Sequence, residues 1–168
     1  FFASAPLGSN PRGLADDPDF MAVLAEAAAN KPANPDMYTT HYAQFVETFV
    51  RVLGDPALPH LFFVEGGALA VENALKTAFD WKSRRNEAVG RPAGLGGKVL
   101  HLTGAFHGRS GYTLSLTNTA DPRKTQYFPK FDWPRIDDPK LSFPTTPEAL
   151  EDAAKVEAVA IEQAKKFL

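Results

Sequence analysis

Apolar side chains recur at helical spacing in the first third of the chain. The members of this stripe fall at i, i+3, i+4, i+7, i+8 and i+11 and are Tyr42, Phe45, Val46, Phe49, Val50 and Leu53. Such a stripe forms one continuous face of an amphipathic helix. Thr39 or Thr40 can cap its start, and Gly54 can end it. The pattern predicts a helix with one continuous apolar face.

Four further segments have helical signals. Asp17 followed by Pro18 predicts a helix that starts there and runs to about Asn30. A short helix is expected over 108–115, and the capping-box sequence over 145–148 predicts a last helix that runs to the end of the chain. The fourth is a helix over 68–85, whose expected buried residues are Val71, Ala74, Leu75, Ala78 and Phe79.

Two short apolar runs, over 60–65 and 98–103, predict buried strands. The predicted helix over 68–85 and a Gly/Pro-rich loop over 90–97 separate them, which is the order of a right-handed βαβ unit in a parallel sheet. The proline-rich and aromatic segment over 119–145 reads as a long ordered loop. We therefore expect an α/β fold with a mostly parallel sheet and flanking helices.

Glycines follow both predicted strands. Gly66 and Gly67 stand between the first strand and the helix that follows, where free backbone N–H groups and the helix dipole favour an anion. The alternative is a plain strand-to-helix connection, since neither a P-loop nor a G-x-G-x-x-G sequence is present. The second predicted strand leads into a Gly-flanked loop over 104–108. Parallel strands end at one edge of the sheet, so the two loops should converge on a cofactor site.

The second loop and its flank carry three candidate site residues. Phe106 is either a core aromatic or a platform for a flat heteroaromatic ring. His107 is either structural or part of the site. Arg109 is either solvated or a bidentate anchor for a substrate carboxylate. No G-x-S-x-G elbow surrounds Ser110.

The composition of the chain argues against several kinds of partner and site. The chain has 168 residues, no Cys and a net charge of −2, so neither disulfides nor a nucleic-acid partner are expected. No apolar run approaches the roughly 20 residues of a membrane span. The four His residues show no ligand spacing, so no metal site is expected. The lack of Cys fits a reducing compartment, and we expect a cytoplasmic protein.

The segments over 65–76 and 106–108 together resemble the class III (ω-) aminotransferases, which bind pyridoxal phosphate on the type I fold. The glycine turn is similar to the family's phosphate-binding turn, although the family's serine hydroxyls are missing here. Residues 1–8, 63–76, 79–82, 104–118 and 128–136 resemble the lysine 6-aminotransferase subfamily in particular. The resemblance covers essentially the whole chain.

The resemblance implies a role for each candidate. Gly67 and Ala68 would bind the cofactor phosphate, Phe106 would stack on the pyridine ring, and His107 would pack beside it. Arg109 would bind the substrate α-carboxylate. The implied reaction transfers the terminal amino group of L-lysine to 2-oxoglutarate in a homodimer.

The same resemblance implies that the chain is a fragment. It starts at Phe1 without an initiator Met and stops at Leu168 within a helical pattern. We expect residues 1–38 to be an entry segment with one helix, extended and turn-rich up to about residue 15, and 39–168 to be the N-terminal part of the cofactor-binding large domain. The family's Schiff-base lysine would lie beyond Leu168, so no catalytic residue is assigned here and the fragment alone is expected to be inactive.

Two alternatives stay open at this point. One is another ω-aminotransferase, acting on ornithine or 4-aminobutyrate. The other is a non-catalytic α/β module that uses the two loops to bind a different phosphorylated ligand.

Overall fold

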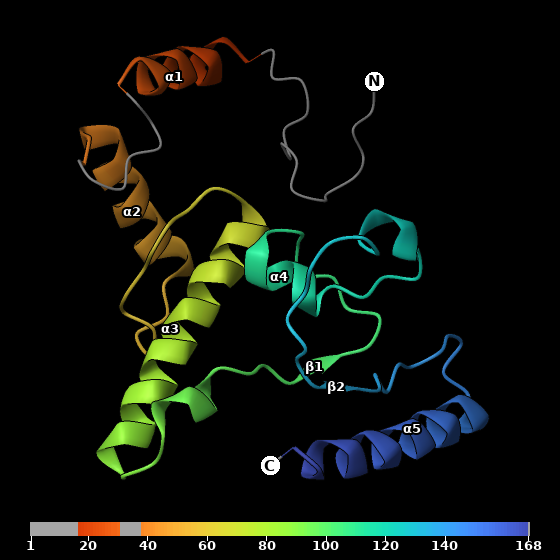
Figure 1. Ribbon diagram of the computed structural model, residues 1–168. Coiled ribbons are helices and arrows are strands. Elements are labelled where there is room, and N and C mark those ends of the chain that lie inside the picture. The colour runs from red at the N-terminus through yellow and green to blue at the C-terminus, as the bar shows by residue number, and fades with distance from the viewer. Residues whose placement is uncertain (1–16, 31–37, 168) are drawn as a thin grey trace. The chain divides into compact units, whose positions relative to one another are not determined.

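The computed structural model describes residues 17–30 and 38–167 and divides the chain into two compact units, 1–66 and 67–168 (Figure 1). The turn-rich entry segment expected over 1–15 lies outside the described residues. The division expected near residue 38 stays a prediction.

Two helices of the first unit form where the sequence predicts them. Helix α1 spans Pro18–Ala29, and its N-cap Asp17 accepts hydrogen bonds from the backbone N–H groups of Asp19 and Phe20. Helix α2 spans Thr40–Leu53 and is capped by the Thr39 hydroxyl, which accepts from Tyr42 N at 3.2 Å. Both predicted helices are confirmed.

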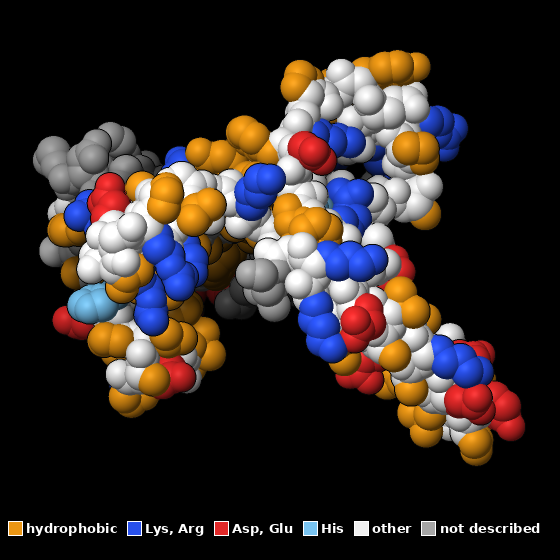
Figure 2. Space-filling model, turned by 60° about the horizontal axis from the view of Figure 1, so that its bottom comes forward, with side chains coloured by type: hydrophobic (Ala, Val, Ile, Leu, Met, Phe, Trp, Pro, Cys, Tyr) orange, Lys and Arg blue, Asp and Glu red, His pale blue; other side chains and the backbone are white. Residues whose placement is uncertain are grey.

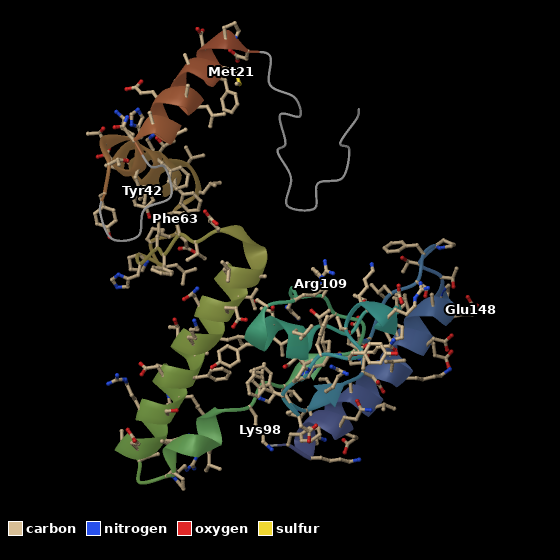
Figure 3. All side chains as sticks on the ribbon, turned by 45° about the horizontal axis from the view of Figure 1, so that its top comes forward. Met21, Tyr42, Phe63, Lys98, Arg109 and Glu148 are labelled. Atoms are coloured by element: carbon tan, nitrogen blue, oxygen red, sulfur yellow. The ribbon has the colours of Figure 1, made fainter. Side chains whose placement is uncertain are left out.

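Three aromatic residues of the α2 stripe pack against one side chain, while Val50 and Leu53 at its end are exposed. The rings of Tyr42, Phe45 and Phe49 lie 6.2, 4.9 and 5.1 Å from the ring of Phe63, all edge-on. Figure 3 shows Tyr42 and Phe63 in this cluster. The strand predicted over 60–65 is wrong, because no strand in the described part of the chain pairs with it. Extended backbone becomes a strand only when a neighbour completes the hydrogen-bond ladder.

Helix α3 spans Gly66–Ala88 and is longer at both ends than predicted. Its covered stripe contains Ala68, Val71, Glu72, Leu75 and Phe79, which recur at helical spacing and are buried or half-buried. The other two residues that the sequence pattern predicted to be buried, Ala74 and Ala78, are exposed because they lie to one side of this stripe.

The sheet of the second unit has two short parallel strands. Strand β1 spans His101–Leu102 and pairs with β2, Arg135–Ile136, in the register His101 to Arg135. The pairing predicted between 60–65 and 98–103 is therefore wrong, and β2 lies inside the predicted loop. Its two residues stand between prolines, so no alternating pattern marks them as a strand. The helix-rich α/β class with a parallel sheet is confirmed.

Four helical segments complete the second unit: η1 (Ala93–Gly96), α4 (Gly111–Leu116), η2 (Pro122–Lys124) and α5 (Pro147–Lys165). The N-cap of α5 is Thr146, which accepts from Ala149 N at 3.2 Å. The predicted capping box, one residue earlier, is wrong because Pro147 is suited to the first helical position. Gln163 of α5 exchanges two hydrogen bonds with Asp137, at 2.8 and 2.9 Å.

Few apolar side chains are buried in the described part of the chain, namely Leu114, Leu116 and Ala160. The buried polar residues are more numerous: Glu72, Asn86, His101, Thr113, Ser115, Thr117 and Thr125. Apolar side chains are visible over much of the face drawn in Figure 2. No helix among the described residues is long and apolar enough to cross a membrane.

The loop between β1 and α4 touches the start of α3. Gly108 has φ of +114°, and a Cβ at this position would lie 2.5 Å from Cβ of Ala68 and 3.0 Å from the Thr113 hydroxyl. Both the backbone conformation and the close approach require glycine. Helix α4 begins at Gly111, three residues later than predicted, because Ser110 is its N-cap.

Replacing Gly108 with Ala is expected to destabilise the protein by about 2–4 kcal/mol, since overpacking and a positive φ both disfavour a side chain. Gly90→Ala is the matched control, with φ of +72° and nothing within 4 Å of the added Cβ. It should cost only about 1–2 kcal/mol. Urea unfolding of the full-length variants measures both, and equal losses would contradict the close contact with Ala68.

His101 links the two strands through its side chain. Arg135 Nε donates a hydrogen bond of 2.9 Å to His101 Nε2, while His101 Nδ1 lies 3.3 Å from the carbonyl oxygen of Val99. The His101 ring is buried, and this burial, helped by the positive charge of Arg135, lowers the pKa of His101. The neutral ring is therefore the form that the folded chain favours.

This lowered pKa predicts a loss of stability in acid. The contribution of His101 is fully present above the unfolded pKa of about 6.5 and declines as the pH falls below it, by at most about 1.4 kcal/mol per pH unit. Thermal unfolding between pH 7.5 and 5 should show a weaker pH dependence in His101→Gln than in the parent. Parallel curves for the two proteins would contradict this assignment.

Candidate functional site

The glycine turn at the start of α3 leaves open space in front of the backbone. Gly66 has φ of +77°, and a Cβ added at Gly66 or Gly67 would meet nothing within 4 Å. The first N–H groups of a helix have no partner within the helix. The start of α3 thus offers backbone donors to an anion.

Thr117, which is 3% exposed, holds the loop after β1 through hydrogen bonds of its hydroxyl group. His107 N donates to the Thr117 hydroxyl at 3.1 Å, and that hydroxyl donates to the carbonyl oxygen of Gly108 at 2.6 Å. Asn118 N donates to the carbonyl oxygen of Ala105 at 2.8 Å. These bonds fix the backbone on both sides of Phe106, whose side chain is 60% exposed. An aromatic face is therefore held by an anchored loop and left open.

Two residues of α3, Ala68 and Glu72, contact this loop and the start of α4. Gly108 packs on Ala68, and the Glu72 carboxyl oxygen Oε1 accepts from Ser110 Oγ at 2.8 Å and from Tyr112 N at 2.7 Å. The contact between Gly108 and Ala68 confirms that the two loops come together. The strand predicted before Gly66 is not formed.

Arg109 stands between the two contact points. Its side chain is exposed, and in the described part of the chain no carboxylate lies within ion-pair distance of it. In Figure 3 Arg109 is labelled beside the start of α4. A guanidinium without a carboxylate partner, on a backbone held at both sides, can bind a ligand carboxylate bidentately.

His107 is half-buried next to the exposed aromatic. No group of His, Asp and Glu within the described ranges is arranged to hold a metal ion.

The five residues that the sequence singled out lie on the two segments that the structure joins. Gly67 and Ala68 belong to the start of α3, and Phe106, His107 and Arg109 belong to the loop. Open backbone donors, an exposed aromatic face and an unpaired guanidinium suit a phosphorylated, flat heteroaromatic ligand together with a carboxylate-bearing one. Pyridoxal phosphate and an amino-acid substrate fit this donor set.

Sequence reasoning missed the two residues that fasten the loop. The sequence pattern assigns no role to Glu72 or to Thr117. Glu72 lies one helical turn after Ala68 and so on the same face of α3. A carboxyl on the face that meets the loop is the signal that could have identified it.

The sequence matches the family model described as aminotransferase class-III over residues 11–167. It is 64% identical to the L-lysine-epsilon aminotransferase of Mycobacterium tuberculosis over 165 residues, covering 98% of this chain and 36% of that protein. It is 61% identical to the corresponding protein of Amycolatopsis lactamdurans over 170 residues, covering 99% of this chain and 36% of the relative. The chain thus spans about a third of the length of these curated relatives.

The fold also matches a solved structure, the M. tuberculosis lysine aminotransferase in the internal aldimine form. The TM-score is 0.79 at 64% identity, and the match covers 90% of this chain and 34% of that one. The family model covers nearly the whole sequence, and the fold agrees with it. The chain therefore belongs to the class III aminotransferase family.

Proposed function

We propose that the full-length protein is a pyridoxal-phosphate-dependent L-lysine 6-aminotransferase that transfers the terminal amino group of lysine to 2-oxoglutarate. The observation that carries this proposal is the 64% identity to the lysine enzyme of M. tuberculosis along 98% of the chain. Identity to the human mitochondrial 4-aminobutyrate aminotransferase is 25% over 161 residues, which favours the lysine enzyme.

The family resemblance gives each site residue a role, and the surroundings of these residues are consistent with it. The backbone N–H groups of Gly67 and Ala68 would donate to the cofactor phosphate, because the first N–H groups of a helix have no partner within it. Phe106 stacks on the cofactor ring, and His107 packs beside that ring. When bound, pyridoxal phosphate supplies the electron sink for the transfer of the amino group.

Arg109 determines which end of the substrate reacts. A guanidinium that holds the α-carboxylate leaves the other end of the substrate, with its terminal amine, free to point toward the cofactor. Lysine and ornithine differ by one methylene between these ends. The span between the guanidinium and the cofactor then selects for length, and one methylene is worth about 1–3 kcal/mol.

Two further features belong to the proposal. We expect a homodimer, as the resemblance implies, and the many apolar side chains exposed in the described part of the chain are consistent with further protein contacts. A cytoplasmic location fits the absence of Cys.

The test is a comparison of amino donors with 2-oxoglutarate as acceptor, using the purified full-length protein supplied with pyridoxal phosphate. Lysine should exceed ornithine in kcat/KM by roughly 10-fold or more, because the missing methylene withdraws the amine from the cofactor. Spectrophotometric detection of the semialdehyde product measures this ratio. A preference for ornithine or 4-aminobutyrate would overturn the assignment.

Replacing Arg109 with Ala is expected to raise KM for lysine about 10- to 100-fold, since charge-assisted hydrogen bonds to a carboxylate are lost. Binding of pyridoxal phosphate, titrated by its absorbance, should remain near that of the parent. Arg84→Ala is the matched control, because Arg84 is exposed on the same unit and pairs with Asp80 at 2.8 Å. Unchanged lysine kinetics in Arg109→Ala would remove this residue from the substrate site.

A further inference from the structure

The backbone of Arg109 is held against α3 from both sides. On one side Gly108 packs on Ala68 with no room for a Cβ. On the other side Ser110 Oγ donates to Glu72 Oε1 at 2.8 Å. Arg109 itself makes neither contact, so its guanidinium is free while its main chain is fixed.

Glu72 is the centre of a buried hydrogen-bond network. Its side chain is 7% exposed, and the single oxygen Oε1 accepts both from Ser110 Oγ and, at 2.7 Å, from Tyr112 N. Ser110 Oγ also lies 2.9 Å from the hydroxyl of Thr113, which is fully buried. Because Glu72 is buried and both bonds go to one oxygen, truncating Glu72 removes the acceptor of Ser110 and Tyr112 at once.

We propose that Glu72 is a positioning residue for Arg109. By holding Ser110 and Tyr112, it fixes where the guanidinium meets the substrate carboxylate. The inference rests on the proposed function, because that function gives Arg109 its ligand.

Helix α3 carries both the phosphate turn and the residue that supports Arg109. Glu72 lies five residues after Gly67, so the phosphate turn and the support of Arg109 belong to the first two turns of α3. A helix is rigid over that distance. The position of Arg109 relative to the phosphate turn is therefore set by one element, and Glu72 makes the connection.

A positioning role and a merely structural role differ in what removal of Glu72 changes. If Glu72 only supports the fold, its loss lowers the unfolding temperature and leaves KM for lysine as it was. If it positions Arg109, KM for lysine rises while pyridoxal phosphate still binds.

The experiment measures lysine kinetics, cofactor binding and amide hydrogen exchange in the full-length protein. Glu72→Ala should raise KM for lysine roughly 10-fold, with the dissociation constant of pyridoxal phosphate changed less than about 3-fold. The Tyr112 amide should exchange faster in this variant. Glu72→Gln keeps an oxygen acceptor and should restore both KM and protection to near the parent values.

Glu87→Ala, an exposed position on the same helix, is the control and should match the parent. If Glu72→Ala does not fold, Glu72→Asp replaces it, because the shorter side chain draws the oxygen away from Ser110 and carries the same expectation.

The outcomes separate this inference from the proposed function. A raised KM in Arg109→Ala beside an unchanged KM in Glu72→Ala, or in its Asp substitute, overturns the inference alone. An unchanged KM in Arg109→Ala overturns both. Raised KM in both variants, with rescue by Glu72→Gln, supports the positioning role.

Discussion

The buried oxygen of Glu72 joins the two segments on which the candidate site depends. It accepts hydrogen bonds from a side chain and a main-chain amide 38 and 40 residues further along the chain. Hydrogen bonds to charged groups contribute about 1.5–3 kcal/mol net, and a buried partner left unsatisfied costs about 1–3 kcal/mol. Because these bonds have fixed partners and directions, the network specifies one arrangement, and the loop with Phe106 and Arg109 inherits that arrangement.

Directional bonds have this role elsewhere in the second unit. His101 and Arg135 connect the two strands, and Gln163 connects α5 to the end of β2 through Asp137. A sheet of two short strands is marginal by itself. Few apolar side chains are buried among the described residues. These polar contacts and the packing of Gly108 on Ala68 therefore maintain the geometry of the loop between β1 and α4.

The sequence predicted features that depend on neighbouring residues and failed for those that depend on residues far apart in the chain. Local signals succeeded: Asp17 and Thr39 cap the helices that their chemistry predicts, and Gly54 ends α2. Pairing failed, because the partner of His101 is Arg135, in a segment whose prolines conceal a strand. Phe63 was assigned to a strand, since an apolar run alone does not reveal that its ring packs on α2. The roles of the candidate site residues come from resemblance and stay predictions, whereas Glu72 and Thr117, whose contacts cross the fold, received no role from the sequence pattern.

The sequence separation of these contacts has a consequence for how the chain folds. In the first unit Phe63 meets Phe49, a near neighbour along the chain, whereas His101 and Arg135 are 34 residues apart and Glu72 and Tyr112 are 40 apart. Closing long loops costs entropy before any contact compensates for it, so contacts of this kind form slowly. We expect the aromatic cluster around Phe63 to form early and the loop that carries Arg109 to reach its place late. During that interval the two strands lack their partners, so their backbone hydrogen-bonding groups are open to pairing with another chain.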